Sequence, residues 1–139
     1  MTEEDLVRTW RSMHCRHAMI WASLERTLQD RHNVGASEYE VLDRLAEATH
    51  GKLRVQELAD AVCLSQSALS RLIARLESAG LVVRAMCDMD RRGIFVEMTG
   101  EGRSRHAEAR STHLAVLGEM LTDQWVVPPS LSKSAGPKA

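Results

Sequence analysis

The stretch that decides the fold is residues 64–84, which read LSQSALSRLIARLESAGLVVR. Apolar residues recur in it at i, i+3, i+4 and i+7, the spacing of one buried helix face, at Leu69, Leu72, Ile73 and Leu76. Ser65 predicts the N-cap of this helix, and Gly80 predicts the left-handed residue that ends it. The sequence therefore predicts an amphipathic helix with a polar outer face.

The segments on either side extend this helix into a recognisable unit. A shorter helix is expected over residues 57–62, followed by a tight turn at Cys63 and Leu64. Two β-branched runs, 81–86 and 94–98, flank the charged stretch 87–93 and predict a hairpin. A helix pair with a short turn, followed by a hairpin with a basic tip, is the winged helix-turn-helix arrangement, whose second helix enters a DNA major groove.

Long helices are predicted at both ends of this unit. Thr2 is expected to cap a first helix, and Thr99 a last one that runs through Leu114 and Leu121. Between the first helix and the helix pair, Ser37 and Glu40 have the spacing of a capping box and predict where another helix starts. All three prolines lie beyond residue 127, so none interrupts these helices.

The fold class predicted is mostly α with a small β-hairpin wing, a winged helix-turn-helix flanked by N- and C-terminal dimerisation helices. The expected divisions are residues 1–33 for the first dimerisation helix, 34–99 for the DNA-binding domain and 100–125 for the second dimerisation helix. Residues 126–139 are rich in Ser, Lys, Gly and Pro and are expected to be a disordered tail.

Composition excludes several classes of protein. The chain has 139 residues and a formal net charge of −1, and no apolar run approaches the roughly 20 residues of a membrane span. Three widely spaced cysteines without a CxxC argue against a disulfide framework or a structural zinc site. We therefore expect a cytoplasmic protein without a cofactor or a membrane partner. Residues 51–105 carry nine Lys and Arg against seven Asp and Glu, so any site for a polyanion should lie there.

The polar face of the second helix supplies the candidate DNA contacts. Small hydroxyl and amide side chains can approach base edges, and arginines can reach guanine or phosphate. The recognition-helix candidates are Ser65, Gln66, Ser67, Ser70, Arg71 and Arg75. An ordinary solvated helix face is the alternative interpretation, and the attached wing with Arg91 and Arg92 favours DNA.

The whole constellation resembles the MarR family of bacterial transcription regulators. The resemblance covers residues 37–102, and it rests on residues 64–84, on Asp-Met-Asp-Arg-Arg at 88–92 and on Met-Thr-Gly-Glu-Gly at 98–102. It implies a homodimer on a pseudo-palindromic double-stranded DNA operator, usually a repressor released by a small-molecule effector or by oxidation. It also implies that Asp90 holds the wing, that Arg92 enters the minor groove and that Arg91 lies near phosphate.

The chain departs from the family pattern near its end. The family builds its dimer from the first and last helices, and a final amphipathic helix is expected where Trp-Val-Val-Pro-Pro stands at 125–129. The dimer interface is therefore expected to be smaller or rearranged.

The resemblance also suggests where an effector would act. A ligand pocket between the dimer helices and the winged domain would draw on Trp10, His14, His17, Tyr39 and Asp43, although plain core or dimer-interface packing is favoured for these residues. Candidate redox-sensitive thiols are Cys15, Cys63 and Cys87. A buried or inert thiol is favoured for Cys15, whereas Cys63 and Cys87 are expected to be more exposed, with an inert thiol favoured for both. A zinc site from His14, Cys15, His17, His106 and His113 is disfavoured because their spacing is not diagnostic.

Two other classes of function compete with DNA binding. An enzyme would need a nucleophile with its base, paired carboxylates or a phosphate-binding loop, and the eight glycines lie scattered at predicted turns. A winged helix used only for protein contacts is the main alternative, but it would not need Arg71, Arg75, Arg91 and Arg92 together.

Overall fold

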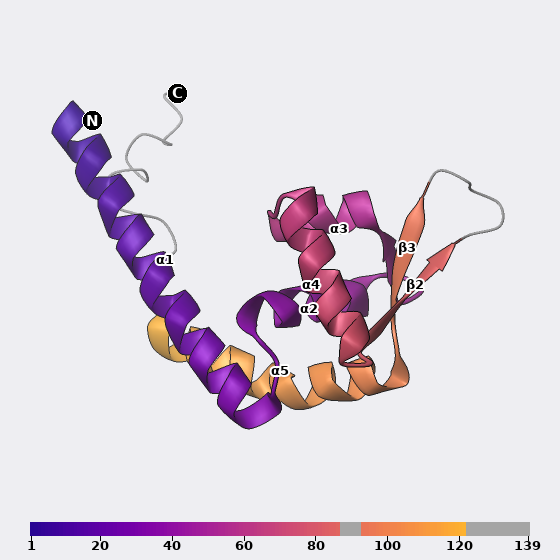
Figure 1. Cartoon of the computed structure of the whole chain (residues 1–139). Coiled ribbons are helices and arrows are strands. Elements are labelled where there is room, and N and C mark those ends of the chain that lie inside the picture. The colour runs from indigo at the N-terminus through magenta and orange to yellow at the C-terminus, as the bar shows by residue number, and fades with distance from the viewer. Residues whose placement is uncertain (87–92, 122–139) are drawn as a thin grey trace, which may run out of the picture.

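The computed structural model describes residues 1–86 and 93–121 of the chain. Its elements, in chain order, are α1 (Glu3–His32), α2 (Ala36–Glu47), β1 (Lys52–Arg54), α3 (Val55–Val62), α4 (Gln66–Ser78), β2 (Val82–Met86), β3 (Ile94–Met98) and α5 (Gly100–Met120). This confirms the predicted mostly helical fold with a small antiparallel wing between two long helices (Figure 1). The wing tip and the expected tail at 126–139 lie outside the described residues.

Three of the four predicted N-caps are confirmed, and α3 begins at Val55, two residues before its predicted start. The side chains of Thr2, Ser65 and Thr99 accept from backbone N–H groups at the starts of α1, α4 and α5. At α1 the cap is reciprocal, because Asp5 accepts from the N–H of Thr2, and this bond lowers the pKa of Asp5. Gly80 ends α4 with φ of 77°, as predicted.

The predicted start of α2 is wrong. Its N-cap is Gly35 rather than Ser37, and the N–H of Gly35 donates to Glu38 Oε1 at 3.0 Å. The next N–H, that of Ala36, donates to Glu25 Oε2 at 3.0 Å. Glu25 belongs to α1, so a carboxylate from another helix stabilises the positive end of α2. Sequence spacing alone could not show this contact.

The sheet has one strand more than the predicted hairpin. The strand order is β1-β3-β2, and both pairs are antiparallel. In the first pair Leu53 faces Val96, and in the second Val82 faces Met98. The sequence predicted only the two strands of the hairpin, because three residues are too few to show a strand pattern. The extra strand fixes the start of α3 against the wing.

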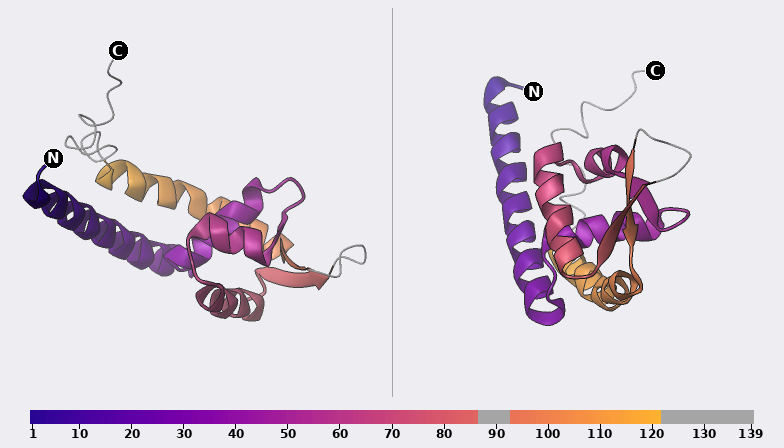
Figure 2. Two further views of the ribbon diagram at one scale, coloured as in Figure 1. Left: turned by 90° about the horizontal axis from the view of Figure 1, so that it is seen from above. Right: turned by 45° about the vertical axis from the view of Figure 1, so that its right-hand side comes forward.

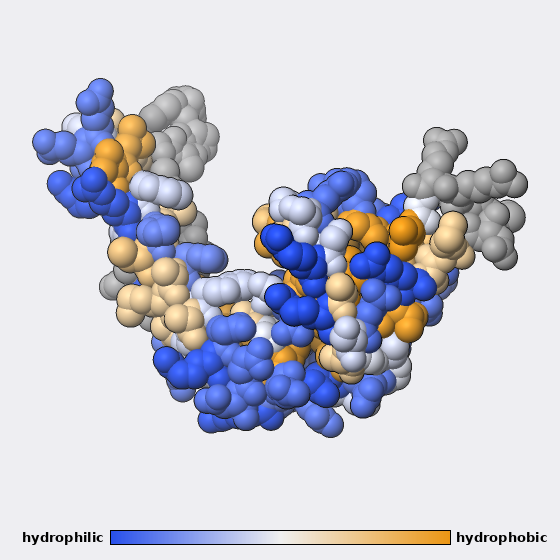
Figure 3. Space-filling model, viewed as in Figure 1, coloured by the Kyte–Doolittle hydropathy of each residue, from blue (hydrophilic) through white to orange (hydrophobic). Residues whose placement is uncertain are grey.

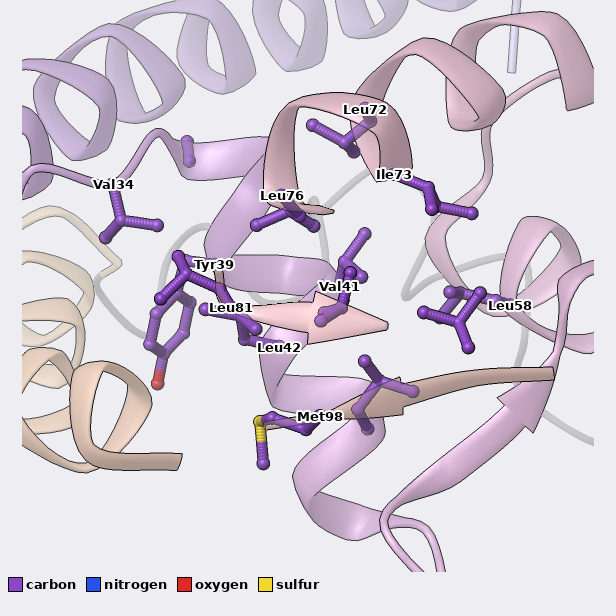
Figure 4. Packing of buried hydrophobic residues seen from close by; sticks show 14 of the residues in the cluster. Val34, Tyr39, Val41, Leu42, Leu58, Leu72, Ile73, Leu76, Leu81 and Met98 are labelled. Carbon is purple, nitrogen blue, oxygen red and sulfur yellow. The ribbon is translucent and has the colours of Figure 1, made fainter. Parts of the chain in front are cut away.

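The core lies where α2, α4 and the sheet meet. The four apolar residues that predicted the decisive helix, Leu69, Leu72, Ile73 and Leu76, are all buried, and Figure 4 shows three of them directed toward α2 and the strands. They pack against Val41, Leu42, Leu58, Leu81 and Met98, among others. Burying one face of α4 in this way turns its polar face outward.

The two long helices meet through only part of their lengths. Leu24 and Leu28 are the buried residues of α1, and they lie in its C-terminal half. Side-chain bonds tie this end of α1 to α5: His32 Nε2 lies 2.7 Å from Thr112 Oγ1, and Arg105 donates to the carbonyl of Asn33 at 3.1 Å. The N-terminal half of α1 extends away from the winged domain as an arm (Figures 1 and 2).

The outer parts of both helices expose apolar side chains. Leu6, Trp10 and Met13 recur at helical spacing on the arm, and all three are exposed. Figure 3 shows apolar residues on this arm beside hydrophilic ones. On α5 the predicted stripe divides, because Leu114 and Leu121 are exposed while Ala109, Thr112 and Val116 face inward. Of the helices in the described part, none is long and apolar enough to cross a membrane.

We expect Gly102→Ala to lower the free energy of unfolding by about 1 to 3 kcal/mol. A Cβ at Gly102 would overlap the carbonyl oxygen of Leu81, which accepts from the N–H of Thr99, and would lie 2.8 Å from Met98 Cγ. Denaturant unfolding measures the change.

Gly118→Ala is the matched control on the same helix, because a Cβ there meets nothing within 4 Å. It should raise stability by up to about 1 kcal/mol through helix propensity. Equal effects of the two substitutions would show that Gly102 is not required for close packing.

Candidate nucleic-acid interface

The exposed face of α4 carries the residues predicted to contact DNA. Ser65 is the N-cap, and Gln66, Ser67, Ser70, Arg71 and Arg75 all lie on the solvent side of the helix. The first turn offers amide and hydroxyl groups, and the later turns offer guanidinium groups. A helix with this distribution can place its N-terminal residues at base edges and its arginines at guanine or phosphate.

A groove of about 370 Å³ runs between α4 and the wing. Gln66, Ser70 and Ile73 line it from α4, and Arg54, Val55, Gln56, Arg84, Gly93 and Ile94 complete it. Its walls therefore come from the recognition helix, from the strand and helix before it and from both strands of the hairpin. Two of the predicted base-reading residues, Gln66 and Ser70, thus share this groove with the wing strands.

The sheet adds basic residues that the predicted site did not include. Lys52 Nζ and the Arg54 guanidinium lie 5.4 and 5.5 Å from the ring centroid of Phe95. Both residues are exposed, and their spacing of two places them on one face of β1. The positive balance of residues 51–105 was the only signal for them in the sequence.

Arg84 on β2 pairs with the recognition helix. Its Nε lies 2.9 Å from Glu77 Oε1, and both side chains are more than a third exposed. The pair joins the C-terminal end of α4 to the hairpin. Pairs this exposed contribute little to stability.

Asp90, Arg91 and Arg92, the predicted wing residues, lie outside the described residues, as does Cys87. β2 ends at Met86 and β3 begins at Ile94, so the described strands lead directly into this segment. The roles assigned to the three wing residues stay predictions.

The candidate pocket residues lie in two separate places within one chain. Trp10, His14 and His17 are exposed on the arm of α1, where Trp10 stacks on His14 and His17 stacks on Trp21. Tyr39 and Asp43 lie instead where α2 meets α5. A single chain does not bring the two groups together.

Tyr39 is the centre of a polar cluster between α2 and α5. It is 1% exposed, and its ring stacks against those of His106 and His113, with centroids 5.3 and 4.3 Å away. His106 Nε2 lies 2.8 Å from Asp43 Oδ1. Burial, and then the charge of Asp43, raises the pKa of Tyr39 to about 12, so the phenol stays neutral. The histidines of this cluster were not predicted to contact Tyr39.

The thiols and histidines form no metal site in the described part of the chain. Within residues 1–86 and 93–121, no group of three or more His, Cys, Asp and Glu is placed to hold a metal ion. Cys15 and Cys63 are free and exposed. The exposure of Cys63 is as expected, whereas the first alternative for Cys15, a buried thiol, is wrong for the single chain. The second alternative, an inert thiol, stays a prediction, as does any response of either thiol to oxidation.

A family model and a curated relative both match part of the chain. Residues 35–94 match the family model described as MarR family. Over 83 residues the chain is 32% identical to the HTH-type transcriptional regulator FarR of Neisseria gonorrhoeae, a match that covers 60% of this chain and 56% of FarR. The chain thus matches little more than half the length of this curated relative.

Two solved structures match over nearly the whole chain. AbsC, a MarR family transcriptional regulator from Streptomyces coelicolor, is 30% identical with a TM-score of 0.80, covering 96% of this chain and 88% of AbsC. Sco3205, a MarR family transcriptional regulator from the same organism solved in complex with DNA, is 31% identical with a TM-score of 0.80, covering 96% of this chain and 82% of Sco3205.

Proposed function

The chain belongs to the MarR family of transcriptional regulators, and from this premise we propose that it is a dimeric repressor that binds a pseudo-palindromic DNA operator. The family consists of regulators rather than enzymes. The proposal rests above all on one observation: the exposed face of α4 and the groove beside it bring Gln66, Ser70 and Arg84 onto one surface. Sco3205, to which 96% of this chain is similar, has been solved with DNA.

In the proposed complex α4 lies in the major groove and the wing reaches the adjacent minor groove. Gln66, Ser67 and Ser70 approach base edges, while Arg71 and Arg75 contact guanine or phosphate. Arg92 enters the minor groove, where the narrow groove concentrates negative potential, and Arg91 lies near phosphate. Lys52 and Arg54 extend the positive surface along the sheet.

Dimerisation is assigned to residues 1–33 and 100–125, and DNA binding to residues 34–99. The apolar residues exposed on the arm, Leu6, Trp10 and Met13, support this assignment, because a contiguous apolar patch on a single chain marks an interaction surface. Two copies related by a twofold axis would present two α4 helices to successive turns of DNA.

Release from the operator is assigned to a small-molecule effector or to oxidation. Tyr39 and Asp43 lie at the contact between α2 of the winged domain and α5, so a ligand there would act on both parts. Cys63 ends α3 with φ of 57°, at the start of the turn that leads to α4, and its thiol is exposed. Its oxidation would disturb the turn that positions the recognition helix. The repressor would act in the cytoplasm, where its operator lies.

Selection of bound DNA from a random pool, followed by a salt titration, tests the proposed function. We expect an inverted repeat whose half-site centres are about one helical turn apart. The logarithm of the binding constant should fall linearly with the logarithm of salt concentration, because phosphate contacts release counterions. Enrichment of an asymmetric site bound by a monomer, or no enrichment, would contradict the proposal.

We expect Asp90→Ala to weaken operator binding although it removes a negative charge close to DNA. If Asp90 holds the guanidinium of Arg92, its loss frees a side chain whose rotamer entropy must then be lost in the complex. Screening at physiological salt leaves the opposing charge effect small. A double-mutant cycle with Arg92→Ala at fixed salt measures the coupling, and additive losses would show that the two residues act independently.

A further inference from the structure

Three polar side chains form a hydrogen-bonded chain that ends at the start of the recognition helix. On α3, Gln56 Nε2 donates to Asp60 Oδ1 at 3.1 Å. From α4, Gln66 Nε2 donates to Gln56 Oε1. All three residues are exposed, and Gln56 and Gln66 line the groove beside the wing. We call Asp60, Gln56 and Gln66 the amide relay.

The hydrogen bonds of the amide relay run in a single donor-to-acceptor direction, which the carboxylate of Asp60 fixes. An ionised carboxylate can only accept, so Gln56 must turn its NH₂ group toward Asp60. Its carbonyl oxygen then faces Gln66, which must in turn donate through its own NH₂ group. Gln66 therefore keeps a carbonyl oxygen and one N–H for any further partner. A neutral amide at position 60 would remove this constraint, because it can donate as well as accept.

The free groups of Gln66 match one base in the major groove. Adenine presents the N7 acceptor and the N6 donor side by side, which pair with an N–H and a carbonyl oxygen. Guanine presents two acceptors, N7 and O6, so its O6 would meet the carbonyl oxygen of Gln66 without a hydrogen between them. A reversed relay would leave the NH₂ group of Gln66 free and would favour guanine.

We propose that the amide relay makes Gln66 specific for adenine, with Gln56 and Asp60 as the positioning residues that fix its orientation. This inference rests on the proposed function, since it requires α4 to lie in a major groove. Gln66 is the first residue of α4, and the N-terminal residues of a recognition helix are those that contact base edges. Asp60 thus determines which base Gln66 prefers, although Asp60 itself does not contact DNA.

The test is selection from a random DNA pool with the full chain and its variants. The parent should prefer adenine over guanine by roughly ten- to a hundredfold at one position in each half-site. Gln66→Ala should remove this preference at that position alone. Asp60→Asn should reduce it to about threefold or less, because both directions of the relay then make the same number of hydrogen bonds.

A second substitution restores the direction of the relay. In the Asp60→Asn background, Gln56→Glu places a carboxylate that can only accept, so Gln66 must again donate, and the preference for adenine should return. This double variant has the net charge of the parent. Glu57→Gln is the charge-matched control for Asp60→Asn, because it removes one negative charge from the same helix while Gln can still accept from the N–H of Arg54. It should leave the preference unchanged.

The outcomes separate this inference from the proposed function. A parent that selects a symmetric operator, together with an Asp60→Asn variant that keeps the full adenine preference, overturns the relay and leaves the regulator in place. The same holds if Gln66→Ala changes no base preference or if Gln56→Glu fails to restore it. A parent that selects no sequence overturns the proposed function and the relay with it.

Discussion

Trp10→Glu is expected to convert the protein into monomers and to weaken operator binding by about a hundredfold or more. Trp10 is 65% exposed on the arm of α1, between Leu6 and Met13. In the proposed dimer it is buried against a second copy, so a carboxylate there would lose its solvation without gaining a partner. A monomer also loses the avidity of two linked half-site contacts, which is worth about 10² to 10⁴ in affinity.

Sedimentation of the protein and titration of the selected operator measure the two effects. Met19→Glu is the matched control, because Met19 is also exposed and lies nine residues further along α1, on the opposite face of the helix. It should leave both the mass and the affinity unchanged. A Trp10→Glu variant that remains a dimer would place the interface elsewhere.

Arg71→Ala should cost about 1 to 3 kcal/mol of operator affinity and relax the base preference at one position, if Arg71 pairs with a guanine. Arg71 is exposed on the same face of α4 as Ser67 and Ser70, one turn after the helix start. A contact with phosphate instead would weaken all sequences alike and lower the salt slope by about one. Selection with the variant, followed by titration at several salt concentrations, distinguishes the two contacts.

Arg8→Ala is a suitable control for the loss of a positive charge. Arg8 lies on the arm, away from α4, and its ion pair with Asp5 is exposed. Such a pair contributes little, so affinity and salt slope should stay close to those of the parent. Equal affinity of the Arg71→Ala variant and the parent for the selected operator would remove Arg71 from the DNA contacts.

The sequence predicted most of the structural features that depend on residues close together in the chain. Apolar spacing determined which face of α4 is buried, and with it which side chains point outward. The caps at Thr2, Ser65 and Thr99 and the left-handed Gly80 followed from residue type and position. These features are local, because a cap or a helix stripe forms between residues no more than a few positions apart.

Only part of the candidate site could be predicted from the sequence. The residues that α4 contributes to the site could be predicted, because the helical period alone distinguishes the exposed positions of this helix from its buried ones. Arg84 could not be assigned, because its pairing with Glu77 depends on how the hairpin packs beside the helix. The direction of the amide relay depends in the same way on α3 approaching α4, which brings Gln56 within reach of Gln66.

Tertiary structure alone decided the features that join distant segments. Glu25 of α1 caps α2, β1 pairs with β3, and Tyr39 lies between two histidines of α5. Each of these contacts joins residues that lie far apart in the sequence, so no repeating pattern relates them. Whether such a contact forms depends on how the chain between the two residues folds. The helices and the polar face of α4 were therefore determined by the sequence, whereas the connections that orient them came only from their packing.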